Sequence, residues 1–150
     1  MAINIKTFCP FILKIKMKES DTMKFNSLIP ELSVSNINQS REFYLNLGFT
    51  IKYERPENNF CFLELEENQI MIEQINENWS VGTLEYPYGR GINISMTIKD
   101  IDKMYNDLKI KKVKFFQDLE THAYRVGSEI SYDKEFLIQD PDGYLLRFNN

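Results

Sequence analysis

The chain has few of the histidine and cysteine residues that metal centres and disulfide scaffolds require. Its 150 residues include one histidine, one tryptophan and two cysteines, Cys9 and Cys61. Two cysteines without a CxxC spacing provide neither a disulfide framework nor a cysteine metal motif. We expect both to be free thiols in a reducing cytoplasm. A single histidine, His122, excludes a site with two histidines and a carboxylate within one chain.

The sequence also lacks a basic excess and a long apolar run. The net charge is −4 and the pI is near 5.1, which disfavours a nucleic-acid partner because no basic stripe stands out. No apolar run approaches the length of a membrane span, so no membrane partner is expected. With 43% hydrophobic residues, 11 Phe and 8 Tyr, the composition predicts one packed globular domain.

The first 22 residues differ from the rest. The segment Phe8–Leu13 is apolar, and Lys14, Lys16 and Lys18 follow it. The apolar part is short and no small-residue cleavage site follows, so the segment does not read as a secretory signal. We interpret 1–22 as a loosely ordered extension, and 23–150 as a single domain.

The C-terminal stretch repeats an earlier one. Phe136–Arg147 matches Phe62–Glu73 position for position, at a constant offset of 74. In each copy one apolar run is followed by a second, as in a β-hairpin, and the segment Asp140-Pro141-Asp142-Gly143 has the composition of a tight turn. The strand and helix that begin each unit correspond at an offset of 64. The sequence therefore predicts two tandem units, about 24–75 and 91–150, joined by a connector at 76–90.

Each unit has the order βαβββ. In the first, a strand within Phe25–Val34 precedes a helix that Asn36 caps and Gly48 ends. In the second, a strand at 92–98 precedes a helix capped by Asp100. The remaining strands are predicted at 49–55, 59–66, 69–75, 112–118, 133–139 and 143–148. About ten extra residues in the second unit form a loop at 119–132, around His122 and Tyr132. The fold class is α+β.

This pattern resembles the vicinal oxygen chelate superfamily, which includes glyoxalase I, extradiol dioxygenases, fosfomycin-resistance enzymes and bleomycin-resistance proteins. Three segments carry the resemblance: Ser40–Phe49, Lys134–Phe136 and Asp140–Gly143. It covers residues 24–150. The resemblance implies two tandem modules whose curved mixed sheets surround a concave cleft, in a homodimer.

In metal-dependent members, the resemblance places the metal ligands at Ile29, Glu73, Asn93 and Arg147 of this chain. Only Glu73 has a side chain suited to such a metal, and an arginine would repel a divalent ion. Pro30-Glu31-Leu32 and the segment 140–147 resemble the metal-free bleomycin-resistance branch instead. That branch implies stoichiometric binding of a small molecule in grooves at a dimer interface, without cofactor or catalysis.

The candidate ligand-binding residues are charged, polar or aromatic side chains near the expected cleft: Glu31, Phe60, Glu73, Trp79, Tyr88, Asn93, Ser95, Tyr132 and Arg147. Their predicted ligand is an aromatic or cationic compound, and the resemblance implies an antibiotic such as bleomycin. Three alternatives stay open. Glu73 and Arg147 either form a structural ion pair or anchor a ligand. Asn93 and Ser95 lie either on a solvated sheet face or in the pocket. His122 is either a surface residue or a general base.

Two other functions also remain open. The first is a lyase or isomerase of the glyoxalase and dioxygenase kind with altered active-site residues, using Glu73, His122 or Tyr132 as acid or base. The second is a sensing module whose partner is another protein, which the extension at 1–22 would suggest.

Overall fold

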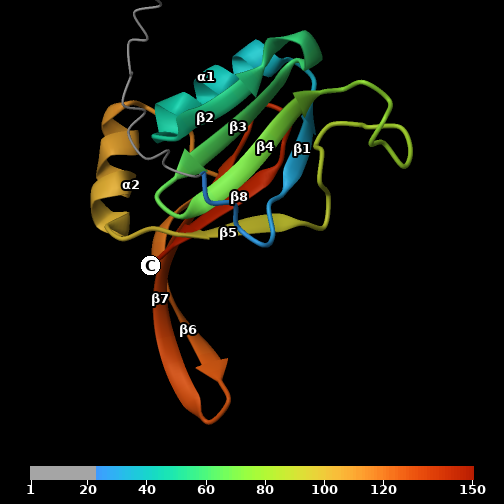
Figure 1. The fold of residues 1–150 in the computed structure, drawn as a ribbon. Coiled ribbons are helices and arrows are strands. Elements are labelled where there is room, and N and C mark those ends of the chain that lie inside the picture. Colours follow the sequence, from blue (N-terminus) through green and yellow to red (C-terminus); the bar gives the residue numbers. More distant parts are fainter. Residues whose placement is uncertain (1–22) are drawn as a thin grey trace, which may run out of the picture.

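The computed structural model describes residues 23–150, so the predicted order of the extension at 1–22 lies outside the described residues. Two modules of the same order follow each other (Figure 1). The first contains β1 (Glu31–Val34), α1 (Ile37–Leu47), β2 (Thr50–Arg55), β3 (Phe60–Leu65) and β4 (Asn68–Gln74), with a short 3₁₀ turn at Pro56–Asn58. The second contains β5 (Asn93–Thr97), α2 (Ile101–Ile110), β6 (Gln117–Val126), β7 (Glu129–Gln139) and β8 (Leu145–Asn149).

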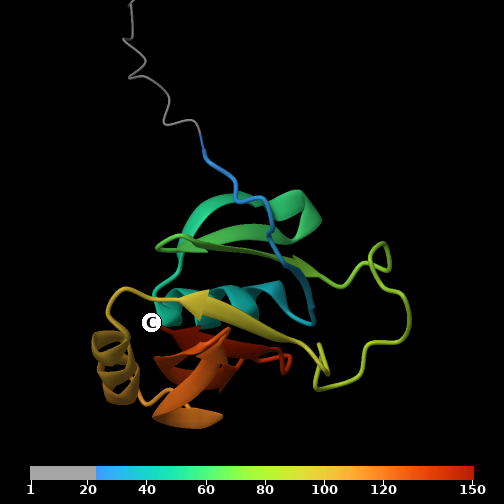
Figure 2. The same ribbon diagram turned by 90° about the horizontal axis from the view of Figure 1, so that it is seen from below.

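Each module forms one four-stranded mixed sheet (Figure 1, Figure 2). The strand orders are β1-β4-β3-β2 and β5-β8-β7-β6. β1 is parallel to β4 and β5 is parallel to β8, whereas the other pairs are antiparallel. The predicted α+β class and the two tandem βαβββ modules are confirmed. β1 and β5 are therefore edge strands of their sheets within the described part of the chain.

The helix caps are those that the sequence predicts. The Asn36 side chain accepts a hydrogen bond from the Gln39 backbone N–H at 3.1 Å, and Asp100 accepts one from Lys103 at 2.9 Å. Gly48 ends α1 in the left-handed region, with φ of 107°. In the described residues neither helix is long and apolar enough to cross a membrane.

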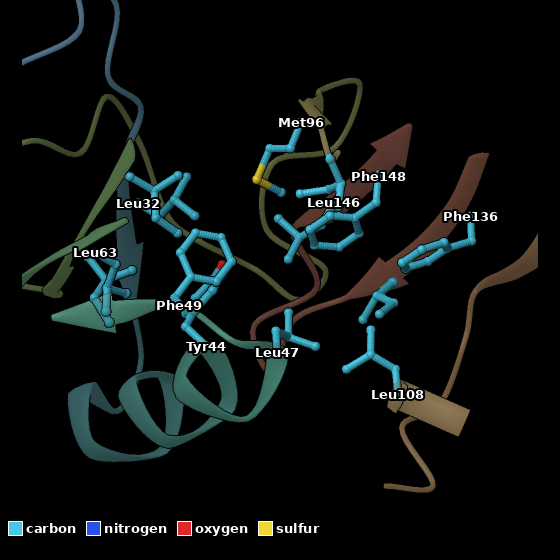
Figure 3. Close-up of a cluster of buried hydrophobic side chains, with 14 of the residues drawn as sticks. Leu32, Tyr44, Leu47, Phe49, Leu63, Met96, Leu108, Phe136, Leu146 and Phe148 are labelled. Atoms are coloured by element: carbon cyan, nitrogen blue, oxygen red, sulfur yellow. The ribbon is translucent and has the colours of Figure 1, made fainter. Parts of the chain in front are cut away.

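One core joins the two modules. Apolar side chains from both sheets and both helices pack together around Tyr44 and Leu47 of α1 (Figure 3). Leu32 and Leu63 come from the first sheet, and the second module contributes residues such as Leu146. Because each sheet buries one face in this core, alternate side chains on its other face are left for solvent or a ligand.

The turn at Asp140–Gly143 fastens the second module to the first. The Tyr44 hydroxyl donates to Asp140 Oδ2 at 2.9 Å, and the Ser35 backbone N–H donates to Asp142 Oδ2 at 3.0 Å. The Tyr144 hydroxyl donates to the carbonyl of Ser33 at 3.0 Å. Burial raises the pKa of Asp140 to about 6, although the hydrogen bond from Tyr44 opposes this shift. The turn thus holds the two modules together in addition to connecting β7 to β8.

The first strand is shorter than predicted. It begins at Glu31 rather than near Phe25, and Leu28 is 86% exposed. Side-chain bonds replace the strand ladder before Pro30: Gln69 accepts from the Asn26 backbone N–H and donates to the Lys24 carbonyl. Proline has no N–H to donate, which fits an end of the ladder at this point.

The predicted loop at 119–132 is wrong. This segment forms most of a long hairpin, the β6–β7 arm, which projects away from the rest of the domain (Figure 1). Gly127 and Ser128 make its turn, with Gly127 at φ of 64°. Glu120, His122 and Tyr124 alternate with Thr121 and Ala123 as a strand requires, and Gly-Ser is a known two-residue hairpin connection. His122 and Tyr132 therefore lie on strands.

The offset of 64 holds for the helices but not for the first strands. Strand pairing sets Glu31 against Met71 and Asn93 against Leu145. Met71 and Leu145 are related by the offset of 74, so Glu31 is equivalent to Asn93, an offset of 93 − 31 = 62. The connection from strand to helix is two residues longer in the second module. Sequence matching alone could not detect this shift because both strands alternate with the same period.

Candidate functional site

A cavity of about 570 Å³ lies between β1, the connector and β5. Its walls are mainly apolar, and its lining residues include Leu32, Val81, Leu84, Ile92, Ile94 and Leu145. Glu31, Ser33 and Glu73 add polar groups, and none of the lining residues in the described part of the chain is a lysine, arginine or histidine. An apolar cavity of this size with a few convergent polar groups is typical of small-molecule sites.

Two glutamates and the single tryptophan meet in this cavity. Trp79 Nε1 donates to Glu73 Oε2 at 3.0 Å, and Glu73 is only 8% exposed. Burial raises the pKa of Glu31, and a hydrogen bond and charge repulsion from Glu73 raise it further, while Arg55 opposes the shift. The indole ring is 69% exposed, so one of its faces is available to a planar ligand.

The fold explains why these side chains meet. Glu31 and Ser33 alternate with the core residues Leu32 and Val34 along β1, and strand pairing sets Ser33 beside Glu73 on β4. Both acidic side chains therefore leave the core face of the sheet. The connector, which begins at the end of β4, places Trp79 beside these two acidic side chains.

The connector is held at its other end by the Asp140–Gly143 turn. The Tyr88 backbone N–H donates to the Asp142 carbonyl at 2.8 Å, and the Tyr88 ring packs edge-on against Tyr144 with centroids 6.0 Å apart. Gly89 and Tyr144 line the cavity, whereas Tyr88 is not among its lining residues. Tyr88 thus supports the cavity wall through Tyr144.

Phe60 does not offer the stacking surface that the sequence suggested. It is 2% exposed, the Arg55 guanidinium lies 3.8 Å from the centroid of its ring, and Tyr53 packs beside it. A cation over the ring and burial leave no face for a ligand. Its strand position was predicted correctly, but contacts from β2 cover it.

Asn93 and Ser95 line a second cavity of about 320 Å³. Ser95 Oγ accepts from Asn149 Nδ2 at 2.6 Å. The other lining residues come from the segment before β1, the β3–β4 turn, the start of β4 and β5: Asn26, Leu28, Pro30, Glu67, Asn68, Gln69, Ile70, Ile94 and Met96. Pro30 and Ile94 line both cavities, so the two adjoin.

Arg147 and Tyr132 lie away from these cavities. Arg147 Nη1 is 3.7 Å from Glu135 Oε2, whereas Glu73 is bonded to Trp79, so the predicted contact between Glu73 and Arg147 does not form. Tyr132 is 71% exposed on the β6–β7 arm. The structure therefore brings together Glu31, Glu73 and Trp79, and separates them from Arg147 and Tyr132.

A second polar cluster occupies the solvent-side face of the second sheet. His122 Nε2 lies 3.4 Å from Glu120 Oε2 and 3.7 Å from Glu135 Oε1. The Tyr124 hydroxyl donates to Glu135 Oε1 at 3.1 Å. Desolvation raises the pKa of Tyr124, and this hydrogen bond raises it further. Glu135 is 6% exposed, so this buried carboxylate touches a histidine, a tyrosine and Arg147. Glu120, Tyr124 and Glu135 were not predicted as site residues, although the alternation of polar residues along 117–126 indicates the strand.

Comparison with known proteins identifies the family. The sequence model of the glyoxalase/bleomycin resistance protein/dioxygenase superfamily matches residues 25–148. The chain belongs to this superfamily. A superfamily member from Vibrio splendidus 12B01 is 35% identical over 79% of this chain and 93% of its own, with a TM-score of 0.36. No curated protein matches the sequence.

Two solved structures of lower sequence identity share the fold. TioX from Micromonospora sp. ML1 is 14% identical, with a TM-score of 0.65, over 84% of this chain and 98% of its own. A bleomycin-binding protein complexed with bleomycin is 17% identical, with a TM-score of 0.59 and the same coverage of both chains. At these identities the likeness supports the fold alone.

The residues do not fit the metal centre found in some superfamily members. Ile29 precedes β1, Glu73 is hydrogen-bonded to Trp79, and Arg147 is beside Glu135. Strand pairing sets Ser33, not Ile29, beside Glu73, and Ser95 beside Arg147. Within residues 23–150 no three His, Cys, Asp or Glu side chains are grouped so that they could hold a metal ion. The protein therefore has a set of side chains unsuited to a divalent metal ion at the positions where the resemblance places the ligands.

Proposed function

We propose that the protein is a metal-independent small-molecule binding protein whose site is the cavity of Glu31, Glu73 and Trp79. The single observation that carries this proposal is a mainly apolar cavity of about 570 Å³ with two adjacent carboxyl groups and an exposed indole. The expected ligand is an aromatic cation, which would stack on Trp79 and neutralise the acidic pair.

Supporting observations come from charge and from the superfamily. Among residues 23–150 no basic side chain lines the cavity, and the nearby charge of Arg55 alone opposes the raised pKa of Glu31. The bleomycin-binding protein shows that the same fold binds an antibiotic. Sequestration of an antibiotic, in a cytoplasmic homodimer, is our proposal for the biological role.

Binding is expected to depend on ligand charge. Titration with 9-aminoacridine, a planar monocation, should quench Trp79, the only tryptophan of the chain. The anion 9-anthracenecarboxylate has a similar tricyclic shape and should bind at least about tenfold more weakly, because it meets two carboxyl groups. Equal affinity for the two compounds would contradict the proposal.

The glutamates are expected to account for this preference. Glu31→Gln and Glu73→Gln should each weaken 9-aminoacridine binding by about tenfold, whereas Glu57→Gln, at an exposed position outside the cavity, should not. Binding should also weaken as the pH falls through the raised pKa of Glu31, because the protonated carboxyl carries no charge. Bleomycin should be titrated in parallel by calorimetry.

A second candidate function is acid–base catalysis by the His122 cluster, favoured by the contact of His122 with the buried Glu135. A carboxylate beside an imidazole can orient it as a general base. Isomerisation of the hemithioacetal of methylglyoxal and glutathione is the reaction to assay. His122→Gln should lower the rate at least about a hundredfold, and Arg125→Gln on the opposite sheet face should leave it unchanged. Equal rates in wild type and His122→Gln reject this candidate.

A further inference from the structure

The two adjoining cavities form one groove between the edge strands β1 and β5. Pro30 and Ile94 line both, so the groove runs from the connector to the β3–β4 turn. Its apolar residues include Leu28, which is 86% exposed, and Ile92, which is 65% exposed. Exposed apolar side chains beside a groove are typical of a surface that binds a partner.

The groove is acidic throughout its length. Glu31 and Glu73 line the larger cavity and Glu67 lines the smaller one, and no basic side chain from residues 23–150 lines either. An apolar groove with carboxylates on its walls fits a segment in which an apolar run lies next to positive charges.

Such a segment exists in this chain. Phe8–Leu13 are six consecutive apolar residues, and Lys14, Lys16 and Lys18 follow directly. We propose that residues 8–18 of the same molecule bind in the groove between β1 and β5, with Phe8–Leu13 against its apolar walls and the lysines beside the glutamates. The segment then competes with small molecules for the larger cavity.

The length and position of the intervening chain permit this contact. Met23 begins the described residues, and Asn26, three residues later, already lines the smaller cavity. Ten residue steps separate Leu13 from Met23, and an extended chain of that length spans up to about 35 Å. A domain of this size has a radius of gyration of about 14 Å. The segment can therefore reach every part of the groove.

The proposal is tested by cysteine trapping, because Cys9 lies within the segment. Val81→Cys places a thiol on the wall of the larger cavity, at a fully exposed position. The control is Ile110→Cys on α2, which is 79% exposed and remote from the groove. Cys61 is buried and its pKa is raised to about 12, so it does not compete in disulfide exchange.

Under mild oxidation, Val81→Cys should form a disulfide within one chain at least about tenfold faster than Ile110→Cys. Adding Cys9→Ser should abolish the product. Lys14→Glu, Lys16→Glu and Lys18→Glu together should slow trapping, whereas the same change at exposed Lys99, Lys109 and Lys114 should not. Equal trapping of the two engineered cysteines, or a product that joins two chains, overturns the proposal.

This inference deepens the proposed function because the segment and the ligand share a site, but trapping requires no ligand. If trapping occurs in the full chain but 9-aminoacridine does not bind to a chain lacking residues 2–22, the small-molecule site alone is rejected. Binding of the dye without trapping would reject the segment alone. Where both hold, removal of residues 2–22 should raise the affinity for 9-aminoacridine.

Discussion

Replacing Gly143 with alanine is expected to lower the free energy of unfolding by about 3 kcal/mol or more. Gly143 has φ of +93°, where a Cβ is strained. The added carbon would also lie 2.5 Å from Pro87 Cβ and 2.7 Å from Pro87 Cα. One of these atoms belongs to the backbone, so the connector itself must move. Urea unfolding followed by circular dichroism measures the loss.

Gly91→Ala is the matched control for Gly143→Ala. Gly91 has a similar φ of +86°, but an added Cβ would meet nothing within 4 Å. The free energy of unfolding of this variant should therefore fall by the conformational strain alone, about 1 kcal/mol. If the two variants lose the same free energy of unfolding, contact between the turn and Pro87 is not what makes glycine necessary at 143.

Because the same contact positions the connector, Gly143→Ala has a functional consequence. Pro87 precedes Tyr88 and Gly89, and Gly89 lines the cavity that also contains Trp79. A shift of this segment should change the cavity wall without altering Glu31 or Glu73. A turn in the second module thereby affects the shape of a site whose two carboxylates belong to the first.

Replacing Tyr44 with phenylalanine is expected to lower the free energy of unfolding by about 2 kcal/mol at pH 8. The hydroxyl of Tyr44 donates to the buried Asp140 carboxylate, and phenylalanine leaves one oxygen of that charge without its donor. The control is Tyr105→Phe, which removes a similar hydroxyl bond to Asp118 at the exposed surface. That variant should lose less than about 0.5 kcal/mol.

The effect of Tyr44→Phe should depend on pH. The pKa of Asp140 is raised from 3.8 to about 6 in the folded protein, so the folded state holds this proton more tightly than the unfolded chain. The stability contributed by that proton is complete below pH 3.8 and is lost as the pH rises through 6. Since the Tyr44 bond lowers the pKa of Asp140, its removal raises that pKa further. The two stability curves should therefore separate as the pH rises above 6. A difference that does not change between pH 4 and pH 8 would contradict this account.

Much of the fold was predictable because its signals are local. Asn36 and Asp100 cap helices at the predicted positions, and β3 and β4 match the predicted strands within two residues. The prediction failed where local rules were overlooked, as at the Gly127–Ser128 turn of the β6–β7 arm. It failed at 25–30 for another reason, because Gln69, distant in sequence, takes the place of a strand neighbour.

The site was predicted only in part. Glu31, Glu73 and Trp79 were chosen for their chemistry and lie together, but nothing in the sequence separates them from Arg147 or Tyr132. Phe60 was expected to be available to a ligand and is buried beneath Arg55. The covering of a side chain depends on residues from other strands, which sequence spacing does not reveal.

The amino-acid sequence by itself determined the two modules, the helix caps, the Asp140–Gly143 turn and the absence of a two-histidine metal site. These follow from residue type and from periods of 2 and 3.6 residues, which act over a few neighbours. Only the tertiary structure decided that Glu73 bonds to Trp79 rather than meeting Arg147, and that Asp140 and Asp142 hold the first module. Both outcomes depend on pairing and packing between residues far apart in the chain.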